Sequence, residues 1–156
     1  MYERILVPHA GTSGGDDALK HAIHIAKSNS SRIIVLHVVE DVPHAPVLAL
    51  HSSQMRSVRR KLKQVTRSIK QKMEDEMSKR TKLCEKEGIR PQLKITTGNP
   101  AEEILKIVKN QKIDLIVMAE RRKLRGIKSL LKLGSVSRKI LENVSCPVLI
   151  ISINKK

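Results

Sequence analysis

The 156 residues include 31 lysines and arginines against 15 aspartates and glutamates, a formal charge of +16. A chain of this length commonly forms one domain, so we expect a single domain over residues 1–156. It has no Phe or Trp and only one Tyr, which argues against nucleic-acid binding by base stacking. Its apolar runs are far shorter than the roughly 20 residues that span a bilayer. We therefore expect a cytoplasmic protein with no membrane segment.

The positive charge would attract nucleic acid, nucleotides or an acidic partner. A lysine-rich surface that serves only solubility explains the charge equally well. The two cysteines, Cys84 and Cys146, lack metal-ligand spacing and are expected to be reduced thiols.

The first third of the chain alternates strand and helix patterns. Residues 4–8 read as a short apolar strand. Ser13, with Asp16 three positions later, has capping-box spacing and predicts a helix over about 16–28. Residues 32–39 are apolar on both faces, which is typical of a buried parallel strand.

The middle of the chain is dominated by one long amphipathic pattern. After a loop that ends near residue 52, apolar residues at spacings of three and four predict a helix over 53–87. Gly88 ends this helix, and Ile89 supplies the apolar contact of a Schellman cap. Residues 91–96 alternate apolar and polar side chains, so we expect a strand near a sheet edge.

Asn99 and Pro100 begin the next helix, as N-cap and first helical residue, and it runs to about residue 110. Asp114 falls inside the buried strand that follows and could mark the edge of that strand. The remaining elements are that strand at 113–118, a helix at 135–143 and a strand at 147–151.

Alternating strands and helices with right-handed crossovers predict an α/β fold with an open, doubly wound parallel sheet and helices on both faces. Ligands of such sheets bind outside the carboxyl ends of the strands, at the switch point in strand order. The loops after Pro8 and after Met118 are therefore the places where a ligand is expected.

Gly134 and Ser135 begin a helix, and free N–H groups at a helix N-terminus bind anions. A turn at Gly134 with Ser135 or Ser137 as the cap explains the same residues equally well. The loop before them is basic, and arginine can grip phosphate with two hydrogen bonds, although a solvated loop is at least as good a reading. Its basic residues are Arg121, Arg122, Lys123, Arg125, Lys128 and Lys132.

Other candidate motifs are weaker. Residues 12–15 are glycine-rich but lack the Lys-Ser/Thr ending of a P-loop, so capping and close helix packing explain them better. His9, at the end of the first strand, is the histidine we retain as a site candidate, and no metal site or catalytic constellation is expected. The basic helix over 53–72 could contact nucleic acid or an acidic partner, but a solvated face is favoured.

Several segments together resemble the universal stress protein family. They begin with Ile5-Leu-Val-Pro8 and Gly11-Thr12, and continue with Val35-Leu-His-Val38 and Gly98-Asn-Pro-Ala-Glu-Glu-Ile104. The most specific part is Asp114-Leu-Ile-Val-Met118, Leu133-Gly-Ser-Val-Ser137 and Cys146-Pro-Val-Leu-Ile150.

The resemblance implies a five-stranded sheet in the order 3-2-1-4-5, a dimer, and a stress-response or regulatory role with at most weak ATP hydrolysis. One subclass of the family binds ATP or AMP at the switch point. In that subclass an Asp after the first-strand Pro, a Val ending strand two and a Gly-x2-Gly-x9-Gly-Ser/Thr motif hold the nucleotide.

This chain departs from that pattern at two places. Ala10 replaces the Asp, and Arg121 and Leu124, or Ala119 and Arg122 in the alternative alignment, replace the two loop glycines, with Gly126 displaced. Side chains there should crowd the usual nucleotide pose, and arginines could grip phosphate instead. The expected nucleotide-binding residues are Pro8, Ala10, Gly11, Thr12, Val38, Met118, Ala119, Arg121, Arg122, Gly126, Gly134, Ser135, Val136 and Ser137.

Two function hypotheses result. The first is a stress-response module that binds ATP, AMP or another phosphorylated ligand in an altered pocket, without a metal. The second is a nucleotide-free interaction protein whose basic surface binds nucleic acid or an acidic protein. In either case an apolar edge strand at Val148, Leu149, Ile150 and Ile151 predicts a homodimer.

Overall fold

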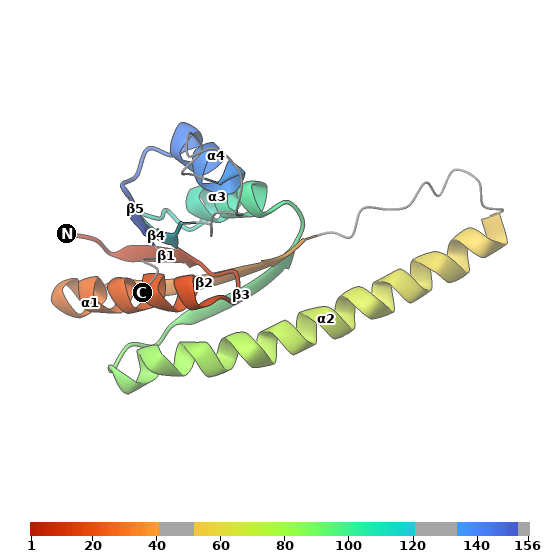
Figure 1. The fold of residues 1–156 in the computed structure, drawn as a ribbon, viewed down its shortest axis with the longest axis horizontal. Helices are drawn as coiled ribbons and strands as arrows, with labels where there is room; N and C mark the ends of the chain where they lie inside the picture. The colour runs from red at the N-terminus through yellow and green to blue at the C-terminus, as the bar shows by residue number, and fades with distance from the viewer. Residues whose placement is uncertain (41–51, 121–133, 153–156) are drawn as a thin grey trace, which may run out of the picture.

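The computed structural model describes residues 1–40, 52–120 and 134–152. They form one parallel sheet of five strands in the order β3-β2-β1-β4-β5, with helices on both faces (Figure 1). The expected fold class and strand order are confirmed. The elements are β1 (Arg4–Pro8), α1 (Ser13–Asn29), β2 (Arg32–Val39), α2 (Ser52–Lys86), β3 (Gln92–Thr97), α3 (Pro100–Asn110), β4 (Leu115–Ala119), α4 (Ser135–Asn143) and β5 (Val148–Ile151).

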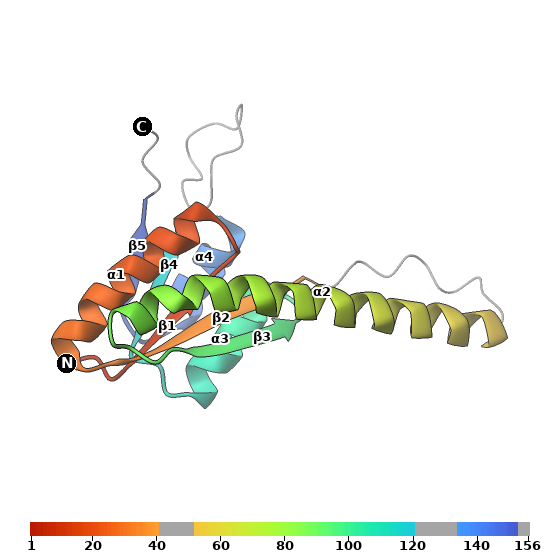
Figure 2. The same ribbon diagram turned by 90° about the horizontal axis from the view of Figure 1, so that it is seen from below.

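Alternate side chains of the central strands pack on opposite faces of the sheet. Ile5 and Val7 of β1 point toward α1 and α2, whereas Leu6 points toward α3 and α4. Two aliphatic cores result, one under each helical layer, as the two views show (Figures 1 and 2). Because the strands are parallel, the carboxyl ends of β1, β2 and β4 lie at the same end of the sheet.

Helix α2 is only partly covered by the sheet. Met77 and Cys84, in its carboxyl-terminal half, are buried in the core, while its amino-terminal half projects well past the sheet (Figure 2). At its end, Ile89 N donates to Cys84 O at 2.9 Å and Gly88 N to Glu85 O at 3.0 Å. With a φ of +77° at Gly88, this is the Schellman cap expected from the sequence.

Two local predictions were wrong. Helix α1 begins at Ser13, because Thr12 is the N-cap and its side chain accepts a hydrogen bond from Gly15 N at 3.3 Å. Asp114 precedes β4, and its carboxylate accepts hydrogen bonds from the N–H groups of Glu3 and Arg4 at 2.8 and 3.1 Å. It therefore lies at the edge of this strand and not inside it, and holds the start of β1 beside β4.

The outer strands differ from the central ones in burial. No residue of β3 or β5 is fully buried, which agrees with the edge position expected for 91–96. Within the described ranges, no helix is long and apolar enough to cross a membrane.

Candidate functional site

A pocket of about 900 Å³ opens at the carboxyl ends of the central strands, where the strand order reverses. Four of the expected nucleotide-binding residues are not seen in the lining. Gly11 lies in the loop after β1 but does not line the pocket, and Arg121, Arg122 and Gly126 lie outside the described residues. The other expected residues all line this pocket: Pro8, Ala10, Thr12, Val38, Met118, Ala119, Gly134, Ser135, Val136 and Ser137.

The amino terminus of α4 forms one wall of the pocket. Gly134 is the N-cap residue and provides no side-chain hydrogen bond to the helix. Neither Ser135 nor Ser137 acts as the cap, because both lie inside the helix. The first N–H groups of α4 therefore have no side-chain acceptor in the part of the chain described, and they face a cavity with the positive end of the helix dipole.

The amino terminus of α1 borders the same pocket but is already capped. Thr12 accepts the hydrogen bond from Gly15 N, and Asp16 in the first turn adds a negative charge favoured by the helix dipole. Ala10 offers only a methyl group to the pocket. This side of the cavity is therefore less suited to an anion than the side formed by α4.

His9 lies beneath the β1 loop, with only 2% of its surface exposed. Its Nδ1 accepts a hydrogen bond from Gly11 N at 3.0 Å, so the ring proton belongs on Nε2, which lies 3.1 Å from Asp16 Oδ1. A Cβ on Gly15 would come within 2.7 Å of this ring. Gly15 is thus required for α1 to pack over His9.

Arg80 of α2 completes a network around the loop. Its Nη1 hydrogen-bonds both carboxylate oxygens of Asp16, and its Nη2 donates to Gly11 O at 2.9 Å. His9 and Arg80 therefore hold the N–H and the C=O of Gly11, whose φ is +76°. The loop beside the pocket is fixed by these two side chains.

The pKa values in this network favour a neutral His9 beside a charged Asp16. Burial lowers the pKa of His9 below 6.5, and the opposite effect of Asp16 offsets this only in part. Partial burial works to raise the pKa of Asp16, but the hydrogen bonds and charge of Arg80, with His9, outweigh it and lower that pKa. The network is therefore intact near neutral pH.

Sequence reasoning identified His9 but missed Asp16 and Arg80 as its partners. Arg80 is 64 positions from Asp16, so only the fold brings the two together. One signal was present, because Arg80 lies three residues after Met77 and four before Cys84 on the buried side of α2. A charged residue in that stripe needs a partner.

The described lining contains acidic but no lysine or arginine side chains. Glu40 and Glu120 both line the pocket, and Glu120 accepts a hydrogen bond from Ser152 at 2.9 Å. Sequence reasoning passed over both, along with Asn99, Pro100 and Ile104. Among the described residues, the terminus of α4 is therefore the part of the lining best suited to attract an anion.

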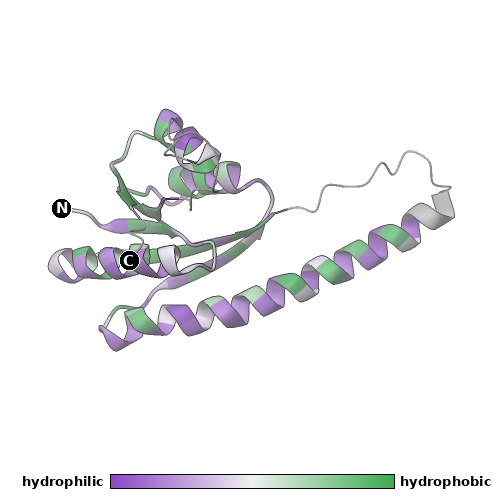
Figure 3. Cartoon of the chain, viewed as in Figure 1, coloured by the Kyte–Doolittle hydropathy of each residue, from purple (hydrophilic) through white to green (hydrophobic). Residues whose placement is uncertain are grey.

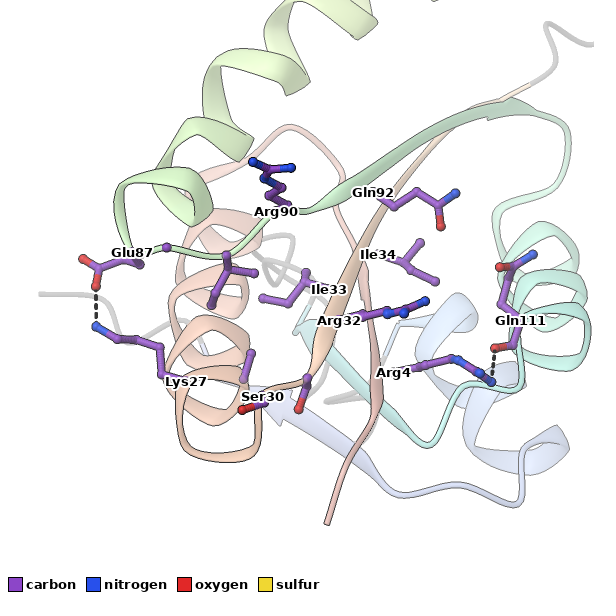
Figure 4. Close-up of a pocket in the computed structure, with 14 residues that line it drawn as sticks. Arg4, Lys27, Ser30, Arg32, Ile33, Ile34, Glu87, Arg90, Gln92 and Gln111 are labelled. Atoms are coloured by element: carbon purple, nitrogen blue, oxygen red, sulfur yellow. Dashed lines mark hydrogen bonds and ion pairs between the residues drawn. The ribbon is translucent and has the colours of Figure 1, made fainter.

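A second cavity, of about 840 Å³, lies at the opposite end of the sheet (Figure 4). Arg4 Nη1 donates to Gln111 O at 3.4 Å, after the end of α3, and Lys27 Nζ lies 2.7 Å from Glu87 Oε2. Two of its cations therefore serve to join helix ends to the sheet and to each other. Because ligands of open parallel sheets bind at the carboxyl ends, the first pocket is the better candidate.

Within the described ranges, no group of three or more His, Cys, Asp or Glu side chains is arranged to hold a metal ion. The donors at the first pocket include the N–H groups that begin α4 and the hydroxyls of the lining serines and Thr12. Such donors suit an anionic or hydrogen-bonding organic ligand.

Comparison with known proteins agrees with the fold. The model of the universal stress protein family matches residues 1–152. This chain belongs to that family. Universal stress protein MJ0531 of Methanocaldococcus jannaschii is 30% identical over 156 residues, covering 100% of this chain and 85% of the relative. The solved structure of MJ0577 from the same organism is 26% identical with a TM-score of 0.80, covering 100% and 99% of the two chains.

Two other solved structures of universal stress proteins contain nucleotides. One, in complex with cAMP, is 16% identical to this universal stress protein with a TM-score of 0.64 and covers 96% of each chain. The other, from Arabidopsis thaliana with AMP bound, is 22% identical with a TM-score of 0.56 and covers 97% of this chain and 92% of that one. At these identities the likeness shows the fold.

Proposed function

We propose that this universal stress protein binds an adenine nucleotide, AMP or ATP, in the pocket at the carboxyl ends of β1, β2 and β4. The observation that carries the proposal is the amino terminus of α4, which faces this pocket without a side-chain cap. The presence of cAMP and AMP in two proteins of the same fold supports the ligand class. The role would be regulatory, with at most weak hydrolysis.

The phosphate would lie against α4. N–H groups of Ser135, Val136 and Ser137, with the hydroxyls of the two serines, are the donors of this wall. Arginines of the segment 121–132 would supply charge that the described lining lacks. In this arrangement side-chain cations replace the glycine-rich loop expected in the nucleotide-binding subclass.

The base would lie nearer β1 and β2, among Pro8, Ala10 and Val38. Ala10 removes the carboxylate that the subclass places there, so base recognition should be weaker than phosphate recognition. Adding that carboxylate back by Ala10→Asp should therefore raise the preference for AMP over other nucleoside monophosphates. A lower preference for AMP in this variant would contradict the assignment of the base to this wall.

Calorimetric titration with AMP, ATP and GMP tests the proposal. In Ser135→Asp a carboxylate stands where the phosphate should lie, and we expect binding to weaken by about tenfold or more, equivalent to 1.4 kcal/mol. The same substitution places an acid in the first turn of a helix, which is mildly stabilising. Loss of binding would therefore not reflect unfolding, and Ser145→Asp, at an exposed residue outside the lining, is the matched control. Absence of binding by the unmodified protein at millimolar nucleotide would refute the proposal.

The proposal includes a cytoplasmic homodimer. The free edge of β5 carries Leu149, which is 37% exposed, and an uncovered apolar edge favours pairing with a second copy. Light scattering at micromolar concentration should give a dimeric mass, and Ile150→Pro should reduce it to a monomer because proline removes a donor from the strand. A monomeric mass for the unmodified protein would contradict the dimer.

A further inference from the structure

The amino-terminal half of α2 carries an apolar stripe outside the α/β core. Leu62, Val65 and Ile69 are 37%, 52% and 36% exposed. The other large apolar side chains exposed in the described ranges, Met1, Leu141 and Leu149, lie elsewhere. Nothing in these ranges covers the stripe, and the helix there stands clear of the sheet in both views (Figures 1 and 2).

The stripe has the spacing of a helix-pairing seam. Val58, Leu62, Val65 and Ile69 follow at intervals of four, three and four, so that Val58 and Val65, and likewise Leu62 and Ile69, are one heptad apart. Apolar residues recur between polar ones along the coloured part of α2 (Figure 3). From 58 to 69 the seam is about 17 Å long at 1.5 Å per residue.

The charge around this seam has one sign. Between residues 52 and 72 there is no Asp or Glu, and the first acid of the helix is Glu74. Arg59 and Lys61 flank the seam on opposite sides, about 80° from its centre at 100° per residue. The eight basic residues are Arg56, Arg59, Arg60, Lys61, Lys63, Arg67, Lys70 and Lys72.

We propose that residues 58–69 of α2 pair with an amphipathic helix of a partner protein that carries Asp or Glu beside its own apolar seam. A second copy of this helix would bring like charges together, which disfavours self-pairing. Nucleic acid would satisfy the charge but leave the seam in water. A membrane surface favours a wider apolar face with aromatic residues, and this chain has no Phe or Trp.

The test uses the full chain and two synthetic helices of three heptads, each labelled with a fluorophore. Both have Leu at the a and d positions, and one has Glu and the other Lys at e and g. Fluorescence anisotropy should show the Glu helix binding about tenfold or more tightly than the Lys helix. Equal binding of the two helices, or no binding of either, would overturn the proposal.

Variants separate the seam from general charge. Leu62→Asp should weaken binding of the Glu helix about tenfold or more, and Arg59→Glu with Lys61→Glu should reverse the preference between the helices. The matched control, Arg60→Gln with Arg67→Gln, removes two charges from the opposite face and should change binding much less. Binding that falls equally in the control and the seam variants would overturn the proposal.

Competing occupants are measured with the same variants. The proposal would be overturned if phosphatidylserine vesicles or duplex DNA bound more tightly than the Glu helix and lost this binding in Leu62→Asp. It would also be overturned if the protein formed a dimer that Leu62→Asp dissociates. Circular dichroism checks that this variant keeps its helix, and Val65→Asp serves in its place if it does not. Unchanged AMP titration of Leu62→Asp keeps this result separate from the nucleotide proposal.

Discussion

Two helix N-termini face the same pocket and differ in whether a side chain caps them. At α1, Thr12 caps the helix, while His9 and Arg80 hold both polar groups of the Gly11 peptide. At α4, Gly134 leaves the first turn without a side-chain partner in the described part of the chain. The amino terminus of α1 is thus capped by a side chain of the protein itself, whereas the N–H groups at the amino terminus of α4 are available to a ligand.

The largest expected loss of stability comes from a substitution that pushes α1 away from His9. Gly15→Ala places a methyl group within 2.7 Å of the His9 ring, which is held by Gly11 and Asp16 and cannot move freely. We expect the free energy of unfolding in urea to fall by about 1–3 kcal/mol. Ser13→Ala, an exposed change in the same turn, should have little effect, and equal losses in the two variants would show that the close approach does not matter.

Removing the cap from α1 should have a smaller effect. Thr12→Ala deletes the acceptor for Gly15 N and should lower the free energy of unfolding by about 1 kcal/mol. Ser135→Ala, the matched change in α4, should leave stability within about 0.5 kcal/mol, because this side chain does not cap its helix. A larger loss in Ser135→Ala than in Thr12→Ala would reverse the comparison.

The smallest effect is a dependence on pH. Because folding lowers the pKa of His9 below 6.5, the unfolded chain binds more protons under mildly acidic conditions. Stability should therefore fall as the pH drops below 6.5. Asp16, whose pKa is also lowered, adds a loss nearer pH 3.8.

Unfolding curves at pH 7.5 and 5.5 measure this dependence. His9→Gln should flatten it, whereas His21→Gln, on the exposed side of α1, should leave it as in the unmodified protein. A slope that is unchanged in His9→Gln would show that other groups titrate, and that His9 is not held neutral by the loop.

Most of the fold could be predicted because its signals are local. Apolar runs marked the buried strands, and Asn99 with Pro100 and Gly88 with Ile89 marked a helix start and a helix end. Helix-start signals overlap at residues 12–16, where Thr12 and Ser13 are both capable caps. The choice depends on how α1 packs over His9, which is not a local property, and the sequence therefore predicted the wrong cap.

The residues of the site could be predicted only where they lie at the ends of strands or in the glycine-containing start of α4. The lining residues of β1, β2, β4 and α4 followed from topology and the family resemblance. The contacts of Arg80 with Asp16 and Gly11 depend on the angle at which α2 crosses the sheet, and no spacing in the chain encodes that angle. Asp114 was misplaced for a similar reason, since its partners lie 110 and 111 residues away.

The bare N-terminus of α4 has a consequence for dynamics. A helix of nine residues with a glycine cap should open more readily than α1, and its amide hydrogens should exchange with solvent sooner. An anion that accepts hydrogen bonds from the first turn would act as the missing cap. Occupancy of the pocket should therefore be recorded as slower hydrogen exchange along α4, with little change along α1.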